Sequence, residues 1–383
     1  MDNNEHIHKH HKNRHRHHRH YSKLYKGMSS KNRHIMKRIY CGVGLLFFVF
    51  ILVLVLMYFN KVKTNKEIDA RKEAVSIQED DGKVSEYSDS RLGVSLSSNE
   101  VSYDGKTYLR NTYIKAYLVM GIDRKDSLED KQVNGSGGQA DAIFLIAYDT
   151  AHNSVKILKI PRDTMTPIPM TDLSGNLLGA DYQHLTLAFG YGDGREQSCQ
   201  FMCDAVSNLL NGFPIDGYIA ATTNVISILN DLVGGVDVVI EQDGLEKANP
   251  AFIKGSKVHL VGDMAEKYVR YRDITEFNSA IDRMDRQTQY LIGFEKQFKH
   301  MVSRDDGFIV KMLDAVTPYM ITSLDKGSYL KLAMDIAASR DITEEDFVTL
   351  PGESYEGVNF DEYHPHKEDI IKMMLSLYFR EST

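Results

Sequence analysis

The sequence has few cysteines and lacks the short motifs of common hydrolases and nucleotide-binding enzymes. Three cysteines in 383 residues exclude a fold that is held together by disulfides. Cys199 and Cys203, four residues apart in a predicted helix, fit two small core residues better than a disulfide pair. No Walker loop, HExxH, CxxC or GxSxG motif occurs, so a serine–histidine or zinc hydrolase has little support. The 42% of hydrophobic residues excludes general disorder, and the length suffices for one large or two ordinary domains.

Charge is absent from one stretch of 21 residues, Ile39–Phe59. At 1.5 Å per residue, a helix of this length spans the roughly 30 Å hydrocarbon core of a bilayer. Tyr40 and Tyr58 lie at its two ends, where amphipathic rings prefer the headgroup level. Lysines at 61 and 63 follow, rather than a small-residue cleavage site. We therefore predict an uncleaved transmembrane helix over residues 39–59 instead of a signal peptide.

The charges on either side of this span predict its orientation. Residues 1–38 carry 11 Lys/Arg, 2 acidic residues and 9 of the 15 histidines, whereas the rest of the chain has a net charge of −16. The positive-inside rule makes residues 1–38 a basic cytoplasmic tail and places the bulk of the chain outside the cell membrane. Such a tail is attracted to anionic membrane lipids. No nucleic-acid partner is expected, because a low-complexity tail of this length holds no folded nucleic-acid-binding domain.

Beyond the span, the apolar pattern divides the chain into three segments. Residues 60–105, rich in Lys, Glu, Asp and Ser, are predicted to be a juxtamembrane stalk. Residues 106–300 form the principal domain, and residues 301–383 form an α/β extension packed on it. Short apolar runs predict strands at 117–122, 141–148, 155–160, 216–221 and 236–240. Helical spacing predicts helices at 196–211, 224–232, 279–302 and 367–379. This alternation indicates an α/β fold, an α-β-α sandwich with a mixed central sheet.

Charged residues gather at the ends of the predicted strands. Asp123 follows the first strand, Asp141 begins the second, and Arg162 and Asp163 follow the third. In an open α/β sheet, ligands bind beyond the strand ends, so these side chains are candidates for a site. Each residue taken alone is equally well explained by a surface ion pair or a cap.

The positions of the arginines give a second indication of a binding site. Arg283, Arg286 and Gln287 share one face of the helix predicted at 279–302, separate from its apolar stripe. Arg270 and Arg272 lie two residues apart just before that helix. Guanidinium groups bind phosphate through two parallel hydrogen bonds, and carboxylates at strand ends hold Mg²⁺ that bridges phosphate oxygens. Together the residues predict a phosphate site, with isolated surface ion pairs as the alternative.

These motifs, in this order, resemble the LytR–CpsA–Psr family of cell-envelope proteins. The resemblance covers roughly residues 110–295, and the basic tail with a single span agrees with it. It rests on Gly121-Ile122-Asp123-Arg124, Gln139-Ala140-Asp141, IPRDT at 160–164, HLTLAFGYGDG at 184–194, PIDGYIAA at 214–221, LVGGVDV at 232–238, and YVRYR with DRMDRQ within 268–287.

The resemblance implies a phosphotransferase that moves a glycopolymer, such as teichoic acid or capsule, from a polyprenyl-pyrophosphate carrier onto peptidoglycan in a Gram-positive-type envelope. It implies Mg²⁺ or Mn²⁺ bound by Asp123 and Asp141. The pyrophosphate would be bound by Arg162, Arg270, Arg272, Arg283, Arg286 and Gln287. The catalytic residues it implies are Asp123, Asp141, Arg162, Asp163 and Arg283, with Asp123 or Asp163 as the base for the attacking sugar hydroxyl.

Three features depart from the family pattern. Gln139 stands where many members have arginine, Ala280 stands where an acidic residue is common, and the loop between Asp123 and Asp141 is long. Two other functions are compatible with the same residues. A hydrolase would cleave the pyrophosphate link with water as the acceptor. A non-enzymatic envelope regulator or transcriptional attenuator would act through the cytoplasmic tail.

Overall fold

The computed structural model of the chain describes residues 94–357 and 360–382. The predicted tail, the predicted span and the stalk up to residue 93 lie outside the described residues. Within the described ranges, no helix is both long enough and apolar enough to cross a bilayer.

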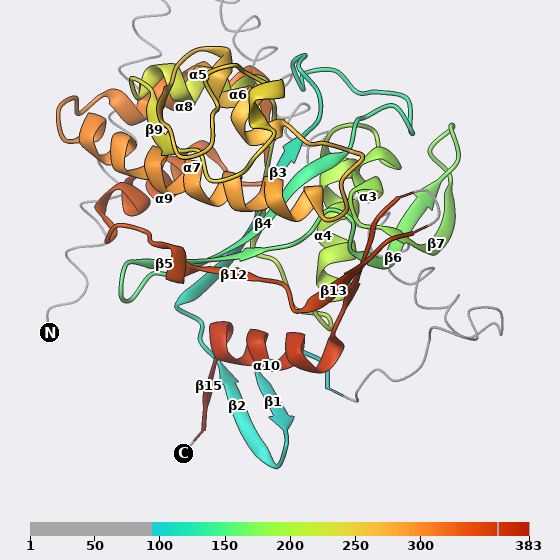
Figure 1. The fold of residues 1–383 in the computed structure, drawn as a ribbon. Helices are drawn as coiled ribbons and strands as arrows, with labels where there is room; N and C mark the ends of the chain where they lie inside the picture. The colour runs from blue at the N-terminus through green and yellow to red at the C-terminus, as the bar shows by residue number, and fades with distance from the viewer. Residues whose placement is uncertain (1–93, 358–359, 383) are drawn as a thin grey trace, which may run out of the picture. The chain divides into compact units, whose positions relative to one another are not determined.

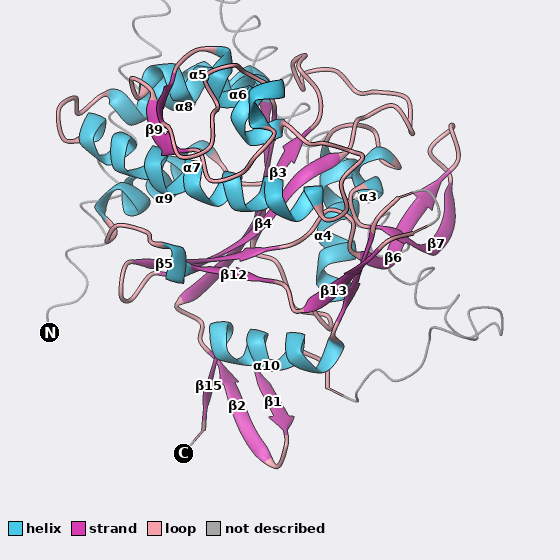
Figure 2. Ribbon diagram, in the orientation of Figure 1, coloured by secondary structure: helices cyan, strands magenta, loops and turns pink. Residues whose placement is uncertain are grey.

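A six-stranded mixed sheet forms the centre of the part of the chain that the structure describes (Figures 1 and 2). Its strands lie in the order β11-β8-β3-β4-β5-β12. The β3–β8 and β5–β12 pairs are parallel, and the other neighbours are antiparallel. This confirms the predicted mixed sheet. The strands are β3 (Ile114–Ile122), β4 (Ala140–Asp149), β5 (Ser154–Lys159), β8 (Gly217–Thr222), β11 (Met320–Thr322) and β12 (Phe347–Thr349).

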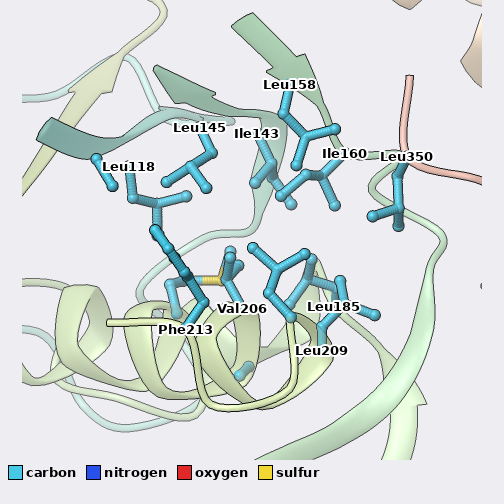
Figure 3. Packing of buried hydrophobic residues seen from close by; sticks show 14 of the residues in the cluster. Leu118, Ile143, Leu145, Leu158, Ile160, Leu185, Val206, Leu209, Phe213 and Leu350 are labelled. Atoms are coloured by element: carbon cyan, nitrogen blue, oxygen red, sulfur yellow. The ribbon is translucent and has the colours of Figure 1, made fainter. Parts of the chain in front are cut away.

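One face of the sheet carries a fully buried apolar core. Alternate residues of β3 and β4, among them Leu118, Ile143 and Leu145, point towards Val206 and Leu209 of the helix below (Figure 3). This alternation follows from the period of two along a strand. The helices on this face are α3 (Leu187–Gly190), α4 (Glu196–Leu209) and α10 (Lys367–Tyr378). Cys199 is buried in this core with Cys203 packed against it, and both are free thiols.

The opposite face is covered by α7 (Ser279–Val302) and α9 (Lys326–Ala338), as Figure 1 shows. Helix α7 has the bounds predicted from its periodicity. Phe144 and Ile157 of the sheet pack with Leu332 of α9 here. Many neighbouring apolar side chains on this face keep partial exposure to solvent. Helices therefore lie on both faces of the sheet.

A second apolar core lies around α7 and is separate from the sheet. It is built from aromatic and aliphatic side chains such as Tyr268, Tyr290 and Phe298. The predicted strand at 236–240 belongs to this region and pairs with β10 in a two-stranded ribbon, not with the central sheet. The elements are α5 (Asn224–Leu232), β9 (Val236–Val239), η2 (Leu245–Lys247), β10 (Lys257–Leu260), α6 (Asp263–Arg270) and α8 (Phe308–Val316).

The remaining elements are small sheets and short 3₁₀ turns. A three-stranded sheet has the order β1-β2-β15, and two hairpins are β6–β7 and β13–β14. Their bounds are β1 (Glu100–Tyr103), β2 (Lys106–Arg110), β6 (Met165–Thr171), β7 (Leu177–His184), β13 (Gly352–Tyr355), β14 (Glu362–Pro365) and β15 (Phe379–Glu381). The 3₁₀ turns are η3 (Thr317–Tyr319) and η4 (Glu344–Asp346).

Two predicted boundaries differ from this arrangement. Strand β1 lies within the predicted stalk, because its pairing with β2 includes it in the folded part. Strands β11 and β12, beyond the boundary predicted at residue 300, form the two edges of the central sheet. The residues after 300 are thus integral to the principal sheet.

Candidate active site

Strand direction brings the predicted site residues to one edge of the central sheet. Strand β3 is antiparallel to β4, and β4 is antiparallel to β5. The end of β3, the start of β4 and the end of β5 therefore meet. Asp123 follows β3, Asp141 is the second residue of β4, and Arg162 and Asp163 follow β5.

A shift in the strand register frees Asp141 from the ladder. Gly121 pairs with Ala142 and Ile122 pairs with Ala140, which leaves Asp141 between two consecutive pairs. An extra residue of this kind is a β-bulge, a device that redirects a side chain at the end of a sheet.

Arg162 links the loop after β5 to the start of β4. Its Nη1 donates a hydrogen bond to Asp141 Oδ1, and its Nη2 donates to Gln139 Oε1 at 2.8 Å. Its Nε donates to Asp163 Oδ1 at 3.2 Å. Gln139, the position where many family members have arginine, is thus a direct partner of Arg162.

Arg283 reaches the same carboxylate from α7. Its Nη1 donates to Asp141 Oδ2 at 3.1 Å, and its Nη2 donates to the Asp141 carbonyl oxygen at 3.0 Å. Arg283 is only 5% exposed. Burial lowers the pKa of its guanidinium from the ordinary value, and the adjacent Asp141 opposes that shift. Asp141 therefore holds two arginines side by side at the edge of the sheet.

Arg272 completes a cluster of three arginines, Arg162, Arg272 and Arg283. Its Nε donates to Ser279 Oγ at 2.8 Å, at the first turn of α7. Its Nη1 lies 3.9 Å from Asp163 Oδ2, and its Nη2 lies 3.6 Å from Asp361 Oδ2. Asp163 is 8% exposed, and its Oδ2 accepts no hydrogen bond from any described residue.

The other predicted phosphate ligands make different contacts. Arg270 forms an ion pair with Glu266 one turn earlier in α6, with 2.8 Å between Nη1 and Oε1. Arg286 donates to the carbonyl oxygens of Tyr268 and Tyr271 and to Gln242. Gln287 Nε2 donates to the Val269 carbonyl at 3.3 Å. Arg286 and Gln287 thus hold α6 against α7, so the arrangement differs from the predicted convergence of five arginines.

The two predicted metal ligands, Asp123 and Asp141, lie in different surroundings. Asp123 is exposed, and its Oδ1 accepts a hydrogen bond from the Gln139 amide at 2.6 Å, two residues before Asp141. No group of three or more His, Cys, Asp or Glu side chains that could hold a metal ion occurs among the described residues. Mg²⁺ is commonly bound through one or two carboxylates together with phosphate oxygens. Both oxygens of Asp141 accept hydrogen bonds from arginines in this structure, so a metal at Asp123 and Asp141 stays a prediction.

Asp361 is a site residue that the sequence analysis missed. It lies just before β14, which the chain brings to the site because Thr164 bridges to Tyr363 and the Tyr363 amide donates to the Asp163 carbonyl at 2.8 Å. No motif marks this segment, so its position follows only from tertiary pairing.

The chain is similar to known proteins in sequence and in fold. The sequence model of the LytR_cpsA_psr family matches residues 59–377. The polyisoprenyl-teichoic acid–peptidoglycan teichoic acid transferase TagV of Bacillus subtilis (strain 168) is 27% identical over 217 residues, 52% of this chain and 51% of that protein. A second relative is the polyisoprenyl-teichoic acid–peptidoglycan teichoic acid transferase TagU of Bacillus anthracis (strain CDC 684 / NRRL 3495). It is 32% identical over 180 residues, 47% of this chain and 51% of that protein.

The chain spans about half the length of these curated relatives. Among solved structures, the crystal structure of B. subtilis TagV is similar, with a TM-score of 0.53 and 23% sequence identity. The match covers 70% of this chain and 96% of that chain. At this level of identity the similarity establishes a shared fold.

Proposed function

Because the chain belongs to the LytR_cpsA_psr family, we propose that it transfers a glycopolymer of the teichoic acid kind from a polyprenyl-pyrophosphate carrier onto peptidoglycan. The names of its relatives describe transfer of teichoic acid from a polyisoprenyl-linked form to peptidoglycan. The cluster of Arg162, Arg272 and Arg283 is the observation that carries the proposal. Three guanidinium groups from separate segments, gathered at one edge of the sheet, suit a diphosphate.

The arginines bind the pyrophosphate and stabilise the charge that builds up as its P–O bond breaks. Arg162 and Arg283 are fixed by Asp141 before any ligand binds, so little reorganisation accompanies the reaction. Asp123 and Asp141 would hold Mg²⁺, which would supply further positive charge at the phosphate.

Asp163 is the base in this proposal. Its Oδ2 is buried and accepts no hydrogen bond from any described residue, with Arg272 Nη1 3.9 Å away, so a lone pair is available for the hydroxyl proton. The acceptor sugar hydroxyl attacks the phosphorus that carries the glycopolymer, and its proton passes to Asp163 Oδ2. The bond between the two phosphates breaks, and its electron pair leaves with polyprenyl phosphate. Asp123 stays a metal ligand in this assignment.

The lipid chain is assigned to the apolar layer between the sheet and helices α7 and α9. Val119, Ile146 and Ile219 of the sheet face Leu291 of α7 there, and all four keep partial exposure. Arg283 projects from the same helix as Leu291, which supports this assignment. The predicted transmembrane helix at 39–59, with the N-terminus in the cytoplasm, would keep this domain at the outer surface of the membrane that supplies the lipid.

A transfer assay tests the proposal. The full-length protein in detergent is given a labelled polyprenyl-pyrophosphate glycan, peptidoglycan and Mg²⁺, and we expect label on the peptidoglycan. Chelation of Mg²⁺ should stop the transfer. Arg283→Ala should slow it about 100-fold, whereas Arg304→Ala, which removes an exposed arginine just after α7, should leave it intact. Release of soluble glycan phosphate without transfer would instead identify a hydrolase, and absence of turnover would refute both activities.

A further inference from the structure

Arg272 donates the fewest hydrogen bonds of the three arginines in the cluster. Arg162 and Arg283 each donate hydrogen bonds from both of their Nη groups. Arg272 donates only from Nε, to Ser279, and within the described residues its two Nη groups make no hydrogen bond. They lie between two carboxylates at 3.6 and 3.9 Å, beyond hydrogen-bond distance. These donors are free to bind an incoming oxygen.

Asp361 is placed beside Arg272 by its main chain. The Asp361 carbonyl accepts a hydrogen bond from His184 Nε2 at 3.0 Å, and two residues later the Tyr363 amide binds the Asp163 carbonyl. The Asp361 side chain takes no part in these contacts. A change of the side chain alone therefore leaves the segment in place.

The charges in the cluster already balance without a ligand. Arg162, Arg272 and Arg283 face three carboxylates, those of Asp141, Asp163 and Asp361. A diphosphate brings further negative charge, so its binding has to displace one carboxylate from its ion pair with arginine. Asp141 accepts hydrogen bonds from two arginines and Asp163 accepts one, whereas Asp361 has only the 3.6 Å ion pair. The carboxylate most easily displaced is that of Asp361.

We propose that Asp361 is the resident counter-ion of Arg272, which a phosphate group displaces when it binds, and that it sets how tightly the site holds an anion. The inference rests on the proposed function, because it concerns the same phosphate site. Asp361 competes with the ligand for the Nη donors of Arg272. When the Asp361 charge is removed, Ser279 and Asp163 still orient Arg272. The ligand then no longer competes with Asp361 for the Nη donors, and this gain exceeds the small loss in the positioning of Arg272.

The test measures the binding of inorganic pyrophosphate with Mg²⁺ to the full-length protein in detergent by calorimetry. Asp361→Asn keeps the shape of the side chain and removes its charge. We expect about a tenfold lower Kd, equivalent to about 1.4 kcal/mol, and a steeper loss of affinity with added salt. Asp361→Glu retains the charge and should stay near the wild-type affinity.

Two further variants isolate the contact with Arg272. Asp341→Asn makes the same change in net charge at a surface ion pair with Lys299. Lys299 lies 16 residues after Arg283 in α7, or about 24 Å along the helix axis. It should not alter the Kd. In an Arg272→Gln background, Asp361→Asn should give no gain, because the competition needs both partners. Thermal melting checks that each variant is folded.

An unchanged or higher Kd for Asp361→Asn, or a gain that persists without Arg272, would overturn the inference. The assay needs neither lipid donor nor peptidoglycan, so it separates the two claims. Tighter pyrophosphate binding by Asp361→Asn together with absent glycan transfer would support the counter-ion and refute the proposed function. Glycan transfer without tighter pyrophosphate binding by Asp361→Asn would support the proposed function and refute the counter-ion. Failure of every variant to bind pyrophosphate would refute both.

Discussion

The two faces of the central sheet use similar apolar side chains but bury them to different degrees. Leu145 of β4 points towards α4 and is completely buried, while its neighbour Ile146 points towards α7 and keeps partial exposure. The same contrast holds for Leu118 and Val119 in β3. Close packing on the α4 face fixes the fold, because filled cores tolerate little change of volume. The α7 face carries Arg283 and combines apolar surface with access to the charged site.

The largest effect is expected from Leu145→Ala, which tests the tighter packing of the α4 face. It deletes a fully buried side chain and leaves a cavity in the core below the sheet, so the free energy of unfolding should fall by about 3–4 kcal/mol. Chemical denaturation monitored by circular dichroism measures this loss. A loss below 1 kcal/mol would show that the α4 face is not the tighter of the two.

The second effect concerns the charged end of the α7 face. Arg283→Ala removes two hydrogen bonds to Asp141 and one of three guanidiniums from the cluster. We expect kcat/KM for glycan transfer to fall about 100-fold, or about 2.7 kcal/mol. Arg283→Lys should restore little, because an ammonium group cannot match two oxygens with a planar fork. Full activity of either variant would remove Arg283 from the site.

A smaller, pH-dependent effect is expected at η4, the turn just before the edge strand β12. The buried Asp346 carboxylate accepts a hydrogen bond from Arg340 Nη1 at 2.7 Å and forms an ion pair with Lys156 at 2.9 Å. These contacts, that with Arg340 foremost, hold the pKa of Asp346 well below its usual range.

A lowered carboxylate pKa stabilises the fold above the unfolded pKa of about 4, and this stabilisation is lost as the pH falls towards the folded pKa. Asp346→Asn should therefore cost about 1–2 kcal/mol at pH 7, and the difference from wild type should shrink below about pH 4. Denaturation at a series of pH values measures this, with Asp341→Asn as a surface control. A difference that is independent of pH would exclude the ionised carboxylate as its source.

The smallest effect on stability is expected from Ile146→Ala, the counterpart of Leu145→Ala on the other face. Because the side chain is partly exposed, its truncation should lower the free energy of unfolding by about 1 kcal/mol. Because the lipid is assigned to this layer, KM for a long-chain polyprenyl donor should rise, while KM for a donor with a short isoprenoid should not. Equal losses of stability in the two variants would contradict the contrast between the faces.

The long elements of the fold were predictable because their signals are local. Strand β4 is an apolar run of strand length, and α7 shows helical periodicity over 24 residues. The β6–β7 hairpin gave no such signal, since Pro167 and Pro169 lie within β6 and proline usually argues against a strand. Strands β11 and β12 have three residues each, too few for a periodic pattern.

The candidate site was predictable in its residue types but not in its contacts. Arg283 and Arg286 share a helical face, yet only Arg283 contacts Asp141, because carbonyls at the end of α6 take the donors of Arg286. Which arginine is used in this way depends on how α6 packs on α7, and spacing along one helix does not encode that packing. Asp361 depends similarly on the bridge between Thr164 and Tyr363.

Both edge strands of the central sheet are synthesised after the four strands between them. A chain made from its N-terminus completes β3, β4, β5 and β8 before residues 320–349 emerge. Until then, β5 and β8 expose unpaired backbone amide and carbonyl groups, which invite pairing with other chains. When β11 and β12 arrive, they cap these two strands. These two short strands therefore cover the backbone groups that the earlier strands leave exposed, and we expect ribosome-stalled chains that end before residue 320 to be the most dependent on chaperones.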